Sequence, residues 1–107
     1  MKKAMENSLC FAVLDGKDKL VGFARMVTDN ATFGYLADVF ILESHRGLGL
    51  SNMLMRFISE YPSLQGLRRT LLATSDAHEL YKKFDFKPLS NPRSFMEKWV
   101  PDIYLKS

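Results

Sequence analysis

Residues 39–51, VFILESHRGLGLS, join an apolar run to the start of a helix through a loop that contains two glycines. The first four residues are continuously apolar, as in a strand that is covered on both faces. From residue 50 onward, apolar residues recur at the three- and four-residue spacing of an amphipathic helix, at positions 50, 53, 54, 57 and 58. A strand that leads straight into a helix predicts a crossover to a neighbouring parallel strand.

The segments before this stretch predict antiparallel strands. Two β-rich runs, residues 9–14 and 20–28, flank the turn sequence Asp15-Gly16 and indicate a hairpin. Gly22 inside the second run indicates either a bulge or a close approach of another chain segment. Residues 32–42 form the third predicted strand.

The segments after residue 51 alternate between helix and strand. The helix should end near residues 61–62, and residues 67–74 read as the next strand. A short second helix is marked by Ala77, Leu80, Tyr81 and Phe84. Residues 86–89 and 95–100 are further strand candidates. We therefore predict one α/β (α+β) domain over residues 1–107, with a mixed, mostly antiparallel sheet, one parallel strand–helix–strand crossover and helices on its faces.

Composition excludes several classes of protein. The chain has 107 residues, 47% of them hydrophobic, which suits one globular domain. Its net charge is +3, and its Lys and Arg residues are scattered among Asp and Glu instead of forming a long basic run. This distribution argues against nucleic acid as a partner. The apolar runs are too short to cross a membrane, and the first residues lack a signal-peptide block. The single cysteine, Cys10, fits a reducing cytoplasm, and we expect it to be a small buried residue.

The loop at residues 46–51 has the chemistry of an anion site. The first backbone N–H groups of a helix have no partner within the helix and carry the positive end of its dipole. Gly47 and Gly49 would let a phosphate approach the backbone, and Arg46 adds a charged donor. The glycine spacing matches neither a Walker loop nor a dinucleotide-binding turn. Because His45 and His78 lie far apart without further ligands, no metal site is expected.

Two motifs resemble those of the GCN5-related N-acetyltransferase (GNAT) family. The segment Arg46-Gly47-Leu48-Gly49-Leu50-Ser51 is similar to the family's pyrophosphate loop, Arg/Gln-x-x-Gly-x-Gly/Ala, with Ser51 at the last place. Downstream, the family pattern Asn-x-x-Ala-x-x-x-Tyr-x-x-x-Gly-Phe is matched by Thr74, Ala77, Tyr81, Asp85 and Phe86. Thr74 replaces Asn, and Asp85 replaces Gly at a turn position that Asp tolerates better than most residues.

The resemblance implies an acyl-coenzyme A N-acyltransferase fold, with acetyl-CoA as co-substrate and no metal. It extends from about residue 9 to the end, so we expect an N-terminally short form in which residues 2–8 are the stub of a helix. The backbone of Phe40, Ile41 and Leu42 would pair with the pantetheine amides, and Thr74 would give a polar contact to the cofactor. The pyrophosphate would be held by Arg46, Gly47, Leu48, Gly49, Leu50 and Ser51. Arg68 and Arg69 either contact the ribose phosphate or form a solvated strand face.

The resemblance also implies a reaction. An amine would attack the thioester directly, and Tyr81 would be the general acid that protonates the departing thiolate. The general base is either Asp38, which burial in the central strand would make more basic, or an ordered water, in which case Asp38 orients the acceptor or anchors a loop. The alternative function is a non-catalytic module that binds coenzyme A or another protein.

The sequence also suggests partners for the chain. The acceptor would be a small-molecule or peptide amine. A second copy of the chain would replace the missing N-terminal wall, which predicts a homodimer.

Overall fold

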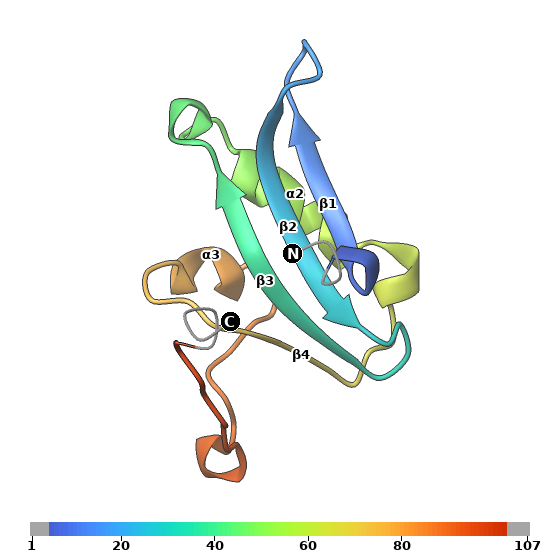
Figure 1. The fold of residues 1–107 in the computed structure, drawn as a ribbon, viewed down its shortest axis with the longest axis vertical. Helices are drawn as coiled ribbons and strands as arrows, with labels where there is room; N and C mark the ends of the chain where they lie inside the picture. The colour runs from blue at the N-terminus through green and yellow to red at the C-terminus, as the bar shows by residue number, and fades with distance from the viewer. Residues whose placement is uncertain (1–4, 103–107) are drawn as a thin grey trace.

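The structure is a computed structural model that describes residues 5–102. It contains one sheet of four strands in the order β1-β2-β3-β4. The strands are β1 (Leu9–Leu14), β2 (Leu20–Thr28), β3 (Phe33–Ile41) and β4 (Arg69–Leu72). Helix α2 (Leu50–Ser59) connects β3 to β4, and the short helix α3 (His78–Lys82) follows β4 (Figure 1). Of the predicted helix stub at residues 2–8, residues 2–4 lie outside the described residues, and Met5 and Glu6 are helical.

The predicted topology is confirmed. Strands β1 and β2 form the antiparallel hairpin, and β2 pairs antiparallel with β3. Strand β4 pairs with β3 in parallel, as a strand–helix–strand crossover predicts. Gly22 allows a close approach, because a Cβ atom there would lie 2.6 Å from Cδ1 of Ile41.

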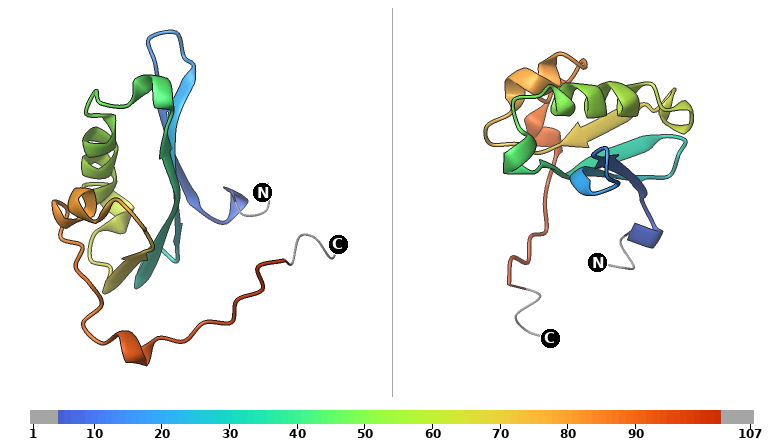
Figure 2. Two further views of the ribbon diagram at one scale, coloured as in Figure 1. Left: turned by 90° about the vertical axis from the view of Figure 1, so that its left-hand side faces the viewer. Right: turned by 90° about the horizontal axis from the view of Figure 1, so that it is seen from above.

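The core lies between one face of the sheet and α2. Figure 2 shows α2 and α3 on the same face of the sheet. The buried apolar side chains that meet there are Phe11, Val13, Val21, Ala24, Met26, Leu36, Ile41, Leu54, Met55, Ile58 and Tyr81. The two-residue period of a strand accounts for Phe11 and Val13 in β1, Ala24 and Met26 in β2, and Gly34 and Leu36 in β3.

The buried face of α2 differs from the predicted one. Met53 and Phe57 were expected inside, yet their side chains are 53% and 59% exposed, whereas Met55 is 2% exposed. The helix therefore presents Leu54, Met55 and Ile58 to the sheet. Phe57 instead lies at the flank of the helix, where its ring contacts the ring of Phe11 at 6.0 Å.

The C-terminal strand candidates are wrong. Residues 86–89 and 95–100 have no ladder with any described strand. Their composition is β-favouring, but Pro88 and Pro92 each lack the backbone N–H donor that a strand ladder needs. A short 3₁₀ helix, Pro92–Ser94, stands between them, and Phe95 directly after it has an extended backbone conformation. Among the described residues, no helix is long and apolar enough to cross a membrane.

Candidate acyl-coenzyme A site

Strands β3 and β4 separate at the middle of β3. Their parallel pairing runs from Phe33 opposite Arg69 to Leu36 opposite Leu72, where β4 ends. Strand β3 continues to Ile41, so its last five residues have no β4 partner within residues 5–102. The result is a sheet edge with backbone groups that can pair with an extended ligand.

A bulge at Asp38 marks the point of separation. The register between β2 and β3 shifts between Phe23 and Arg25, and Asp38 has a φ of 54°. A left-handed residue in a strand turns the chain locally and re-aims its neighbours. This bulge explains why β3 leaves β4 here, and sequence patterning gave no signal for it.

The predicted pantetheine-binding segment is only partly available. The backbone N–H of Leu42 donates to the carbonyl of Val21 at 2.8 Å, and the carbonyl of Leu42 accepts from the N–H of His45 at 2.9 Å. The N–H of Leu42 is therefore not free to pair with a ligand as predicted, and its carbonyl already accepts one hydrogen bond. Phe40 and Ile41 pair with β2 on one side and have no β4 partner on the other side among the described residues, although the carbonyl of Ile41 also accepts from Arg46.

The loop at residues 46–51 has the geometry of an anion cradle. Gly47 and Gly49 have φ values of 81° and 78°, which side-chain-bearing residues rarely adopt, and a Cβ at either position would meet only open space. Gly49 is the N-cap residue of α2 and has no side chain that could accept a hydrogen bond. The backbone N–H groups of the first helical turn therefore have no side-chain capping partner. These donors open to solvent beside exposed Leu48.

Arg46 is held at the base of this loop. Its Nε donates to the carbonyl of Ile41 at 3.1 Å, which ties the loop to the end of β3. One edge of the guanidinium is thus used within the protein, and its terminal nitrogens are left for an anion. The arrangement links the separated strand end directly to the glycine loop.

Tyr81 and Thr74 line one cavity of about 280 Å³ beside β4. Tyr81 is 8% exposed, and its ring packs edge-on against Phe86 with centroids 5.9 Å apart. Burial first, and the charge of Asp76 second, raise the pKa of the Tyr81 phenol above its usual 10. The phenol therefore keeps its proton at neutral pH. Asp38 and residues 46–51 do not line this cavity.

The two departures in the second motif have structural explanations. The Thr74 hydroxyl accepts a hydrogen bond from the N–H of Ala77 at 3.1 Å and so closes the turn that begins α3. Asp85 has a φ of 69°, which is the left-handed conformation expected at the family's glycine position. The N–H of Phe86 then donates back to the carbonyl of Tyr81 at 3.2 Å.

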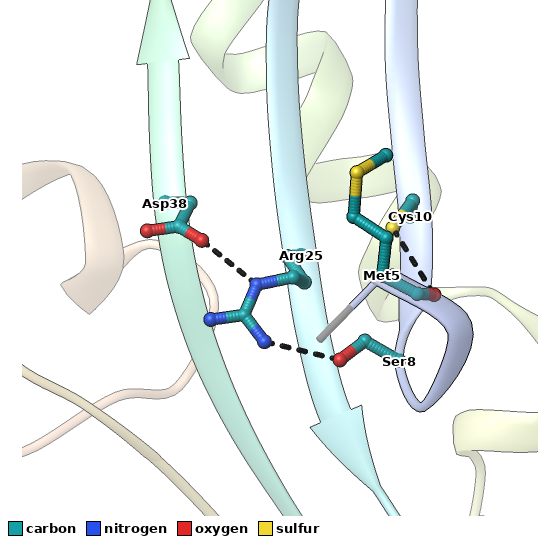
Figure 3. A network of polar contacts seen from close by, with 5 residues as sticks. All are labelled: Met5, Ser8, Cys10, Arg25 and Asp38. Atoms are coloured by element: carbon teal, nitrogen blue, oxygen red, sulfur yellow. Dashed lines mark hydrogen bonds and ion pairs between the residues drawn. The ribbon is translucent and has the colours of Figure 1, made fainter. Parts of the chain in front are cut away.

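Asp38 is not buried. Its predicted role as the general base rested on burial in the central strand, so that argument is lost. Its side chain is 43% exposed, and its Oδ2 accepts from Nε of Arg25 at 2.7 Å (Figure 3). Arg25 is 16% exposed and also donates to the hydroxyl of Ser8 at 3.1 Å. The ion pair with Arg25 occupies one of the two carboxylate oxygens of Asp38. Sequence analysis missed Arg25, because it lies in a run that reads only as a strand.

Two smaller predictions, on Cys10 and on Arg69, also change, and His45 has a side-chain partner. Cys10 is exposed, because it lies on the sheet face opposite buried Phe11, with Sγ 4.0 Å from the carbonyl of Met5 (Figure 3). His45 is half-buried and hydrogen-bonded to the Ser44 hydroxyl at 2.8 Å. The guanidinium of Arg69 lies 5.0 Å from the centre of the Phe95 ring, so it packs against the C-terminal segment.

Comparison with known proteins agrees with this geometry. A profile of the acetyltransferase (GNAT) domain matches residues 6–88. The chain is 46% identical over 66 residues to a candidate acetyltransferase of Gibberella zeae, covering 59% of this chain and 36% of that protein. It is 34% identical to the uncharacterized N-acetyltransferase ycf52 of Pyropia yezoensis, over 80% of this chain and 52% of that one. The chain thus spans between about a third and half of these relatives.

A solved structure is similar over nearly the whole chain. The crystal structure of a candidate GNAT acetyltransferase from Xanthomonas campestris shares 50% identity, with a TM-score of 0.91 over 96% of this chain and 72% of that one. A GNAT protein of Streptococcus pneumoniae shows the same fold at 24% identity, with a TM-score of 0.74 over 92% of this chain and 75% of that one. Together with the glycine loop and the separated strands, these matches show that the chain belongs to the GNAT acetyltransferase family.

Proposed function

We propose that this chain transfers an acetyl group from acetyl-CoA to a primary amine by direct attack on the thioester. The observation that carries the proposal is the left-handed glycine loop at the start of α2, directly after a strand that has separated from its neighbour. Backbone donors at a helix start suit a diphosphate, and an open strand edge suits the amides of a pantetheine arm. Few ligands other than coenzyme A carry both groups in series.

The pyrophosphate would bind the N–H groups at residues 47–51, with Arg46 beside them. Because Nε of Arg46 is fixed to Ile41, the charged group is already oriented when the ligand arrives. The pantetheine would extend along Phe40 and Ile41. Its thioester would then reach the region of the bulge, where a backbone N–H of residues 39–41 would polarise the carbonyl.

The chemical step needs one new bond and one broken bond. The amine nitrogen attacks the carbonyl carbon, and collapse of the tetrahedral intermediate breaks the carbon–sulfur bond. Tyr81 donates its proton to the departing thiolate, the attacking nitrogen gives its surplus proton to water as the amide forms, and Tyr81 is then reprotonated from solvent. Its raised pKa suits a donor, because the phenol stays protonated until the thiolate forms.

The amine must lose a proton before it attacks. Asp38 is exposed and bound to Arg25, so we assign it the role of orienting the acceptor through its second carboxylate oxygen. The proton then passes to water. This assignment chooses one of the three roles that the sequence left open for Asp38.

The decisive experiment combines binding and turnover. Calorimetry would measure acetyl-CoA binding, and release of free thiol would be followed over a panel of small amines and peptides. We expect binding and thiol release with at least one amine. Binding without thiol release across the whole panel would instead support a non-catalytic coenzyme A-binding module. No binding would overturn both functions.

A further inference from the structure

The face of the sheet that is turned away from α2 carries an ion pair beside an aromatic pair. Figure 3 shows Arg25 and Asp38 on this face, with α2 behind the strands. Because side chains alternate along a strand, Phe23 in β2 lies on the same face as Arg25, two residues away. The ring of Phe23 stacks with that of Phe40 in β3, with centroids 6.0 Å apart and an interplanar angle of 29°.

Apolar side chains lie on both sides of this ion pair along the strands. Phe40 is exposed on one side, and on the other side Tyr35 and its cross-strand neighbour Val27 are exposed. Large apolar side chains on a sheet face gain free energy when a ligand covers them. The stacked rings of Phe23 and Phe40 offer such a ligand a flat aromatic surface.

Asp38 gives this apolar face a negative charge. The ion pair with Arg25 uses Oδ2 of Asp38 and leaves Oδ1, on a side chain that is 43% exposed. No other carboxylate occurs in the sequences of β1, β2 and β3. One carboxylate oxygen beside aromatic rings is complementary to a single ammonium group carried on an apolar body.

The position of Asp38 connects this surface to the proposed chemistry. Asp38 lies at the bulge where β3 leaves β4, and Phe40 follows in the stretch that would bind pantetheine. Tyr81 belongs to the core on the other side of the sheet, which α2 and α3 cover (Figure 2). The amine would therefore approach the thioester from the face that the helices leave open, opposite the proton donor.

We propose that this face selects primary monoamines with an aromatic body as acetyl acceptors, an inference that rests on the proposed acetyl transfer. The nitrogen would lie against Oδ1 of Asp38, and the aromatic body would stack on Phe40. A polyamine would place further charges on apolar surface without a second carboxylate in these strands. An amino acid would bring its own carboxylate close to Asp38, while Arg25 is already bonded to Asp38 and Ser8.

A panel of four amines tests this selectivity. Phenethylamine carries the aromatic body, ethanolamine replaces it with a hydroxyl, spermidine adds charges, and phenylalanine adds a carboxylate. Thiol release at saturating acetyl-CoA gives kcat/KM for each amine. We expect the value for phenethylamine to exceed the other three by at least about tenfold. Thiol release without this preference overturns the selectivity and leaves acetyl transfer intact.

Two Phe→Ser variants locate the aromatic contact. Phe40 and Phe33 both lie in β3 and are 42% and 40% exposed, so their replacement removes similar side chains from similar surroundings. The ratio of kcat/KM between phenethylamine and ethanolamine, taken within one variant, cancels any change in acetyl-CoA binding. Phe40→Ser should bring this ratio close to one, and Phe33→Ser should keep the parent ratio. Equal ratios in the two variants overturn the contact with Phe40.

Calorimetry with coenzyme A in place of acetyl-CoA separates recognition of the amine from transfer. We expect phenethylamine to bind this complex, and Phe40→Ser to weaken the binding at least about tenfold. Such binding without thiol release from any amine would support the amine site and contradict the proposed transfer. Thiol release from other amines without phenethylamine binding would overturn the amine site alone. Neither binding nor thiol release would overturn both.

Discussion

Tyr81 combines a packed ring with a phenol that keeps its proton. The ring belongs to the core and contacts Phe86, so a helix of only five residues is held by tertiary packing. The same burial raises the pKa of the phenol, because the charged phenolate is poorly solvated there. One side chain can thus both fix α3 and donate a proton.

Tyr81→Phe should separate these two roles. The ring and its packing remain, so acetyl-CoA affinity and the melting temperature should stay near those of the parent chain. The rate of thiol release should fall by about 10²- to 10⁴-fold, as expected for loss of a general acid. Because the pKa of Tyr81 is raised, the parent rate should not lose this acid until the pH exceeds about 10. Unchanged turnover in the variant would remove Tyr81 from the chemistry.

Asp38→Asn tests whether this residue orients the acceptor or removes its proton. An amide keeps the shape but loses the charge paired with Arg25, which at this exposure should lower the free energy of unfolding by less than about 1 kcal/mol. If Asp38 orients the amine, KM should rise while kcat changes only severalfold. A fall of kcat by about 100-fold or more, with loss of the acidic limb of its pH profile, would identify Asp38 as the base.

The sequence predicted which residues form the site more accurately than it predicted the exposure and the partners of their side chains. The left-handed conformations of Gly47, Gly49 and Asp85 follow from what their positions in the motifs require. The exposure of Cys10 and the ion pair of Asp38 do not follow in this way. Cys10 is exposed because of the face of β1 on which it lies. Asp38 pairs with Arg25 because of a bulge that local sequence does not encode. An arginine 13 residues away in the chain is a partner that only the sheet register reveals.

At the scale of elements, the turn between β2 and β3 is organised by one carboxylate. Asp29 accepts hydrogen bonds from the Thr32 hydroxyl and from the N–H groups of Ala31, Thr32 and Phe33. The bond from the Thr32 hydroxyl is the largest of the effects that hold the pKa of Asp29 well below its usual value. This turn sets where β3 begins and therefore the register that leads to the bulge.

Asp29→Asn should change how acid affects stability. A lowered folded-state pKa means that Asp29 stabilises the fold above its unfolded pKa of about 3.9, and that this contribution declines as the pH falls below that value. The free energy of unfolding should therefore differ most between parent and variant near neutral pH and converge toward pH 2. Urea titrations at several pH values measure this difference. Parallel curves would show that the carboxylate does not organise the turn.

Element boundaries also show what periodicity omits. Strands β1 and β2 and the start of α2 match their predictions, because alternation and helical spacing are both strong there. The inward face of α2 was misjudged, since Phe57 finds aromatic neighbours at the flank instead of the core. Residues 95–100 have the composition of a strand, but a strand also needs a paired neighbour, and composition does not encode one.

At the scale of the molecule, the fold brings an anion cradle to the end of an open strand. Residues 5–102 measure 43 × 37 × 27 Å, and within them the crossover from β3 through α2 to β4 forms both the separated edge and the glycine loop. The order of elements from β1 to α3 was predictable from the periodicity of the segments, whereas the two strands predicted after α3 are wrong. The separation of β3 from β4, which makes the site, arises only when the whole sheet is assembled.

The most direct test of the account is acetyl-CoA binding to two matched glycine variants, measured by calorimetry. Gly49 and Gly66 both have φ near 80° and open space at Cβ, but only Gly49 lies in the loop. Replacing either with Glu should cost about 1–2 kcal/mol of stability through the same backbone strain. We predict that Gly49→Glu weakens acetyl-CoA binding by about 100-fold or more, while Gly66→Glu leaves it unchanged. Equal affinity in the two variants would contradict the loop as the site of the diphosphate.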